Sequence, residues 1–228
     1  MSRSPSPFPL GCAERAPSLS RREREGGAKR RKGEGEPARI AALERFRARL
    51  AADGREVPHF DPLDGGVEAR VLILLETPGA GMTADRAVSR DNPSGTSRNL
   101  ARFSDAAGLR REDTVLWNVV PWVVHAPGAR NRPPRRGDIR EGLTIGLTML
   151  PGLLALLPRL RAAVLLGRPA ADAEPVIRAE RPECAVFTAP HPSPTIVCTR
   201  PCVGERIVAA LSAAVALVEG NESKGMSA

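Results

Sequence analysis

The amino-acid sequence predicts an α/β fold, a three-layer α/β/α sandwich with a central, mainly parallel four-stranded sheet. Four apolar runs of strand length, with helical patterns between them, carry this prediction. The runs show little alternation of polar and apolar residues, which is typical of strands covered by helices on both faces. Strands that alternate with helices favour right-handed β-α-β units, and therefore parallel pairing.

The elements are expected in a regular order along the chain. Large apolar residues at helical spacing between residues 40 and 50 predict the first helix. The Leu-rich segment 138–160 predicts a long helix broken at Pro151, because proline lacks an amide hydrogen and clashes with the preceding turn. Strands are expected within residues 69–79, 114–122, 162–169 and, more weakly, 184–192, and further helices at 96–109, 170–179 and 203–218.

Composition sets the domain boundaries. Residues 1–38 are rich in Ser, Pro, Gly, Arg and Glu and have few periodic apolar residues, which predicts a disordered basic tail. They hold nine Lys/Arg and five Glu, and so contribute half of the net charge of +8. We expect one α/β domain over residues 39–220 and a flexible C-terminus at 221–228. The basic balance favours a polyanionic partner such as DNA.

The four cysteines do not form the disulfide framework of a small secreted protein. Cys198 and Cys202 could be metal ligands, but a metal site needs about four ligands and no second convincing pair is present. We therefore expect reduced thiols, no metal and no cofactor. No apolar run approaches the ~20 residues of a membrane span, and the N-terminus lacks the apolar core of a signal peptide. These features predict a cytoplasmic protein, and we expect a monomer without a membrane partner.

Polar turns follow the predicted strands. In open parallel sheets, ligands bind at the carboxyl ends of the strands. The turn ETPGAG follows the first run, Asn118 lies inside the second, and Arg168 and His191 follow the third and fourth. A buried amide without a partner costs about 1–3 kcal/mol, so Asn118 is expected to bond to a ligand or to neighbouring backbone. His191 either serves a ligand or caps a nearby carbonyl.

Three of these motifs occur in the order of a known family. ETPG after the first strand, WNVVPW at the second and HPSP at the last resemble the motifs of the uracil-DNA glycosylase superfamily. The segment SRDNPSGTSRNLARFSDAAGL, followed by VLWNVVPW, is similar to a bacterial branch described only as uracil-DNA glycosylase-like. The resemblance spans residues 57–217. HPSP alone is moderately specific, whereas the ordered set of three is strong.

The resemblance implies a DNA glycosylase of base excision repair that flips uracil, or a related deaminated base, out of DNA. It implies a bacterial, nucleoid-associated enzyme without metal or cofactor. His191 would donate to the uracil O2, and Asn118 would read the Watson–Crick edge of the base. The turn Thr77, Pro78 and Gly79 would hold the water, Glu76 and Asn92 would line the substrate pocket, and Ser193, Pro194, Thr195, Ile196 and Arg168 would contact DNA.

The sequence departs from the family pattern at the water-activating position. Thr77 stands where relatives carry aspartate or asparagine, and a threonine positions a water without acting as a general base. Asp91 is a candidate replacement base. The aromatic residue that stacks on uracil is not evident, and Gly79 replaces a tyrosine that excludes the thymine methyl in some members. A catalytically weak relative that binds damaged or single-stranded DNA is therefore an alternative. An α/β enzyme of free nucleotides is disfavoured, since no phosphate loop is present.

Overall fold

The structure, a computed structural model, describes residues 38–125, 136–200 and 202–220. Its centre is a sheet of four strands in the order β4-β2-β5-β6, formed by Thr114–Asn118, Val71–Leu75, Ala162–Leu166 and Ala185–Ala189. All neighbouring strands are parallel. Every residue of β2, β4 and β5 is buried, whereas β6, at the edge, is only partly buried. The predicted four-stranded sheet is confirmed.

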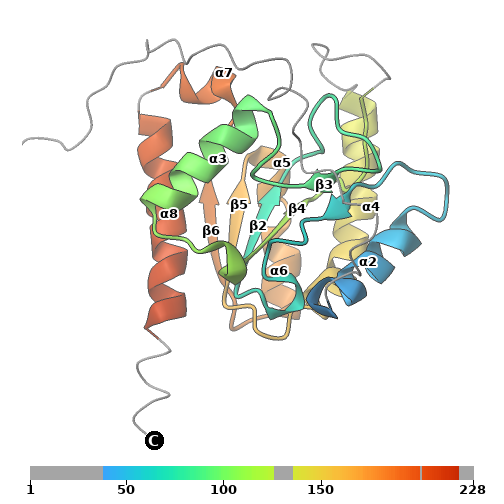
Figure 1. The fold of residues 1–228 in the computed structure, drawn as a ribbon, viewed down its shortest axis with the longest axis horizontal. Helices are drawn as coiled ribbons and strands as arrows, with labels where there is room; N and C mark the ends of the chain where they lie inside the picture. The colour runs from blue at the N-terminus through green and yellow to red at the C-terminus, as the bar shows by residue number, and fades with distance from the viewer. Residues whose placement is uncertain (1–37, 126–135, 201, 221–228) are drawn as a thin grey trace, which may run out of the picture.

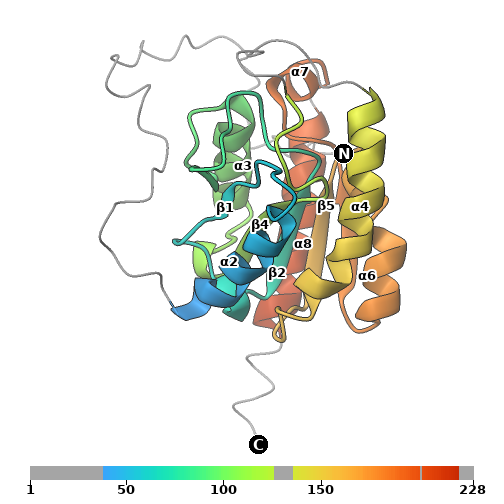
Figure 2. The same ribbon diagram turned by 90° about the vertical axis from the view of Figure 1, so that its right-hand side faces the viewer.

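Helices cover both faces of the sheet (Figure 1, Figure 2). On one face lie α3 (Gly95–Ala106) and α8 (Cys202–Glu219), which contact each other, and α8 packs on β5 and β6. On the other lie α4 (Arg136–Leu154) and α6 (Glu174–Glu180), with α2 (Ala38–Leu50) beside α4. The predicted three-layer sandwich is therefore confirmed.

The long helix α4 differs from its prediction. It is not broken at Pro151 but continues through this residue to Leu154, and then turns. Pro151 lies in the last turn of the helix, so its missing amide interrupts the hydrogen bonding only near the end. Burial of Leu153 and Leu154 against the core stabilises that last turn.

The region expected as one short helix at 170–179 contains two. These are α5 (Arg168–Ala171) and α6, and Pro175 occupies the first turn of α6. Proline is favoured in a first turn, where its missing amide hydrogen has no partner to lose. Pro175 therefore starts a new helix instead of interrupting an existing one.

A second, two-stranded sheet has no counterpart in the sequence prediction. The strands β1 (His59–Phe60) and β3 (Ala87–Val88) pair in parallel beside β4. The Phe60 ring stacks on Trp117 of β4, with ring centroids 3.8 Å apart and planes at 7°. This contact ties the small sheet, and the loops at its ends, to the main sheet.

The topology places a ligand site between β2 and β5. The chain leaves β2 toward the face of α3 and leaves β5 toward the face of α6, although the two strands are neighbours. Such a topological switch point opens a crevice at the carboxyl ends of the strands. The predicted tail at 1–38 lies outside the described residues except for Ala38, where α2 begins, and so does the predicted C-terminus at 221–228.

Candidate active site

A cleft of about 810 Å³ opens at this switch point. Its volume is within the roughly 300–1,000 Å³ of small-molecule sites. The end of β2 contributes Glu76, the end of β5 contributes Gly167 and Arg168, and the end of β6 contributes His191. Pro169, Ala171, Thr188, Ala189, Pro190, Ile196 and Arg206 complete the lining.

His191 is held in one protonation state. The Ser193 backbone amide donates a hydrogen bond to His191 Nδ1 over 3.1 Å. A nitrogen that accepts this bond carries no proton, so the proton of the neutral imidazole is on Nε2. Burial lowers the pKa of His191 to about 4, because desolvation disfavours the charged ring. At neutral pH the imidazole is therefore uncharged and offers an Nε2–H donor.

Gly167 packs against this ring. A Cβ placed on Gly167 would lie 3.2 Å from the His191 Cβ and 3.4 Å from its Cδ2. The backbone of Gly167 has φ 104° and ψ 165°, a conformation essentially restricted to glycine. The end of β5 thus needs glycine both for its backbone and for the position of the imidazole.

The turn after His191 is anchored to the start of α3. Asn99 Nδ2 donates to the Pro192 carbonyl over 2.9 Å. A Cβ on Gly95 would lie 2.3 Å from Cγ of Pro194, so α3 and α7 (Pro194–Val197) are in close contact there. The segment around HPSP is therefore held by α3 as well as by its own prolines.

The turn after β2 brings Glu76 into the cleft. Burial raises the pKa of Glu76, and the nearby His125 opposes this shift. Thr77 is half-buried, Pro78 is buried and Gly79 is exposed, and none of the three belongs to the lining of the cleft. A Cβ on Gly79 would meet no atom within 4 Å, so the space around this residue is open.

Asn118 ends β4 on the other side of β2. It is 2% exposed and lies opposite Leu75 in the register, next to the turn that holds Glu76. Its side chain forms no hydrogen bond with another described residue. Asn118 does not line the cleft of His191, but borders a cavity of about 10 Å³ between α2 and α4. The structure therefore brings His191 and Glu76 together and leaves Asn118 on the adjoining strand end.

Of the residues predicted to contact DNA, Ile196 and Arg168 line the cleft, and the other three lie next to Ile196 at the start of α7. Pro194, Thr195 and Ile196 are exposed on α7, and Ser193 Oγ lies 3.1 Å from Thr195 Oγ1. Ile196 is 39% exposed and lines the cleft. Arg168 is exposed at the start of α5 and lines the same cleft.

Comparison with known families decides the relationship. Residues 62–211 match the model of the uracil DNA glycosylase superfamily. The chain belongs to this superfamily. Its members are generally DNA glycosylases, hydrolases that act on DNA. A search of the curated proteins found none that matches the chain.

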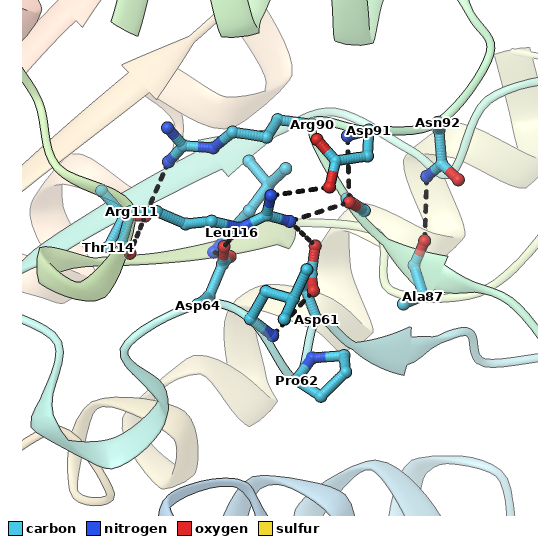
Figure 3. Close-up of polar contacts among 12 residues, drawn as sticks. Asp61, Pro62, Asp64, Ala87, Arg90, Asp91, Asn92, Arg111, Thr114 and Leu116 are labelled. Carbon is cyan, nitrogen blue, oxygen red and sulfur yellow. Dashed lines mark hydrogen bonds and ion pairs between the residues drawn. The ribbon is translucent and has the colours of Figure 1, made fainter. Parts of the chain in front are cut away.

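In this uracil-DNA glycosylase superfamily chain, Asp91 is engaged away from the cleft. Its carboxylate accepts a hydrogen bond from Arg111 over 2.6 Å. Figure 3 shows Arg111 reaching between Asp91, Asp61 and Asp64, which we name together the Arg111 cluster. Asn92 is also turned elsewhere, since its Nδ2 donates to the Ala87 carbonyl over 2.9 Å.

The Arg111 cluster joins segments distant in the sequence. Asp61 and Asp64 follow β1, Asp91 follows β3, and Arg111 begins the 3₁₀-helix η2 (Arg111–Asp113) before β4. Burial, together with the neighbouring Asp61 charge, raises the pKa of Asp64 to about 7, against the opposing pull of Arg90 and Arg111. The cluster therefore fixes the loops on the β4 side of the sheet.

Neither a metal site nor a membrane span is found in the part of the chain that the structure describes. No group of three or more His, Cys, Asp or Glu side chains there could hold a metal ion. Cys184 is buried, Cys198 and Cys202 are exposed, and none of the three is in a disulfide. No helix within the described ranges has the length and apolar character required to cross a membrane.

Four residues of the site were not singled out from the sequence. Gly167 and Asn99 form contacts that only the folded chain creates, Arg206 comes to the cleft from α8, and His125 lies near Glu76 in the segment after β4. Gly167 had one available signal, because glycine directly after a buried strand often marks an unusual backbone conformation.

Proposed function

We propose that this chain is a DNA glycosylase that flips uracil, or a related deaminated base, out of DNA and hydrolyses its N-glycosidic bond. The observation that carries the proposal is the neutral imidazole of His191, which offers its Nε2–H in the cleft at the switch point. A base inside the duplex stack is out of reach, so the enzyme must extrude the nucleotide before it reacts.

The chemistry requires a donor on the base and a water at the sugar. When the bond between the base nitrogen and C1′ breaks, its electron pair moves onto the base and negative charge grows on O2. The His191 Nε2–H donates to this oxygen. One donor placed where charge develops accelerates such reactions by about 10²–10³-fold.

Glu76 is the group that we expect to orient and deprotonate the water. It is the acid among the residues that line the cleft, and its raised pKa makes it a better base than an ordinary glutamate. The water gives a proton to Glu76, its oxygen bonds to C1′, and the base leaves with the electron pair. Thr77, next along the turn, holds this water. Asp91 is paired with Arg111, and this ion pair makes Asp91 a weaker candidate than Glu76 for the role of base.

Asn118, on the strand end next to the turn that holds Glu76, is proposed to recognise the base. Its buried amide has both a donor and an acceptor to offer the Watson–Crick edge and forms no side-chain hydrogen bond among the described residues. The open space at Gly79 leaves room for deaminated bases other than uracil. Ser193 and Pro194 would press on the DNA backbone, and Ile196 would fill the gap in the stack. Action as a monomer in the bacterial cytoplasm remains a prediction from the sequence.

The test uses oligonucleotides that contain one uracil, hypoxanthine or xanthine, in single and double strands, with alkaline scission of the abasic sites. We expect scission by the wild-type protein and a loss of about tenfold or more in His191→Ala and in Asn118→Ala. His59→Ala removes an imidazole outside the cleft and should retain the rate. Wild-type rates in His191→Ala would mean that the base is bound elsewhere.

A second candidate is a DNA-binding relative with little or no catalysis. Thr77 favours it, because a threonine cannot replace the acidic residue of active relatives as a general base. Gel-shift binding of damaged or single-stranded DNA without scission of any substrate would identify this function. Scission that depends on Glu76 would exclude it.

A further inference from the structure

The cleft extends well beyond the two side chains assigned to catalysis. The strand order β2-β5-β6 arranges its lining, with Glu76 at the β2 side, Arg168 after β5, and Thr188 and His191 on the β6 side. Beyond β6, helix α8 adds Arg206. The outer part of the cleft is therefore bordered by two arginines from different elements.

Both arginines are available to a ligand. Their side chains are exposed, and neither forms an ion pair or side-chain hydrogen bond with another described residue. The acid of the cleft, Glu76, lies at the opposite, β2 side. A guanidinium group presents a planar fork of donors that matches the oxygens of a phosphate.

The surface between the arginines suits a sugar-phosphate chain. Pro169, Ala171 and Ile196 supply apolar area, and Thr188 supplies a hydroxyl. A phosphodiester of DNA combines an anionic phosphate with the apolar face of a deoxyribose, and this lining offers a partner for each. A cleft that holds only one flipped base would not need this extension.

We propose that Arg168 and Arg206 form a subsite for a DNA phosphate next to the flipped nucleotide, and that Arg206 positions the strand across α8. The inference rests on the proposed function, and it adds a binding residue, Arg206, from a helix that carries none of the family motifs. The strand would run from His191 past Ile196, so that the apolar side chain and the phosphate contact act on neighbouring nucleotides.

The experiment measures binding rather than catalysis. Fluorescence anisotropy with a duplex that carries a non-cleavable abasic analogue gives the Kd at several salt concentrations for wild type, Arg168→Gln and Arg206→Gln. Each lost phosphate contact should reduce the slope of log K against log salt by about 0.9, which corresponds to about fivefold weaker binding at 0.15 M salt. Arg161→Gln is the matched control, because this exposed arginine directly precedes β5, at the amino ends of the strands and away from the cleft at their carboxyl ends. Circular dichroism melts verify that all variants are folded.

The outcomes separate the subsite from the proposed function. Slopes for Arg206→Gln equal to those of Arg161→Gln, in a protein that still releases uracil, would overturn the subsite alone. Wild-type protein that binds no DNA would overturn both the subsite and the proposed function. A deoxynucleoside monophosphate that raises the melting temperature as much as the oligonucleotide, and loses this effect in Arg206→Gln, would assign the subsite to free nucleotides and overturn the DNA assignment.

Discussion

Replacing Gly167 by alanine tests how the imidazole is positioned. The new methyl group would lie 3.2 Å from the His191 Cβ, so the ring must move by a few tenths of an ångström or more. The backbone at φ 104° and ψ 165° adds about 1–3 kcal/mol of strain for any residue with a Cβ. We therefore expect the free energy of unfolding to fall by about 1–3 kcal/mol. We expect the rate of base release to fall by about tenfold or more, because a displacement of 1 Å costs about 10²-fold.

Two measurements and one control separate the effects. Urea unfolding reports the stability, and single-turnover release of uracil at saturating enzyme reports the chemistry of the folded protein. Gly108→Ala is the control, because Gly108 also has a positive φ, 70°, but an added Cβ there would meet no atom within 4 Å. It should lower stability and retain the rate. A wild-type single-turnover rate in Gly167→Ala would refute the placement of His191 in the reaction.

Three further predictions concern single side chains. His191 should titrate near pH 4, and ring-nitrogen NMR should show its single proton on Nε2 above that pH. Because the imidazole of the unfolded chain takes up its second proton near pH 6.5, His191 should lower the free energy of unfolding by up to about 3 kcal/mol as the pH falls from about 6.5 to 4. Asp64, with a folded pKa of about 7, should lower the free energy of unfolding as the pH rises from about 4 to 7. In urea titrations, the free energy of unfolding of Asp64→Asn should therefore rise relative to that of the wild type across this window, and the difference should stay constant above it. Asn99→Ala removes the bond to the Pro192 carbonyl and should cost about 1–3 kcal/mol in unfolding and slow base release. Asn99→Asp, which keeps the size but not the donor, should behave similarly, and a wild-type rate in both would show that the turn needs no anchor.

The central strands could be predicted because their signal is local. A run such as VLILL is buried on both faces, and continuous apolar composition suffices to identify it. The β1–β3 pair could not be found in this way, since each strand has two residues and no periodicity. The Arg111 cluster joins residues up to 50 positions apart, so nothing in the local sequence indicates which charges pair.

The orientation of Glu76 could not be predicted from the alternation of side chains along a β-strand. Glu76 was expected to line the substrate pocket, but alternation along a strand predicts that Glu76 and Thr77 point to opposite faces, which gave no reason to move the water-activating role from Thr77 to Glu76. The strand β2 ends at Leu75, however, and residues 76 and 77 form a bend, so the rule does not apply to them. The family motif points to the turn that contributes Glu76 to the cleft, and only the folded backbone shows which side chain of that turn enters it.

The two halves of the proposed site are supported differently. His191 is held by the Ser193 amide, by contact with Gly167, and through a turn that Asn99 anchors to α3, so its donor is in place before any ligand binds. Preorganised donors of this kind contribute most to catalysis, because no reorganisation is needed as charge develops. The Glu76 side chain forms no hydrogen bond with another described residue, and the nearby His125 only offsets the rise in its pKa that burial causes, so its position responds to what enters the cleft. Substitutions around Glu76 should therefore weaken the activation of the water, whereas substitutions around His191 should weaken the stabilisation of the leaving base.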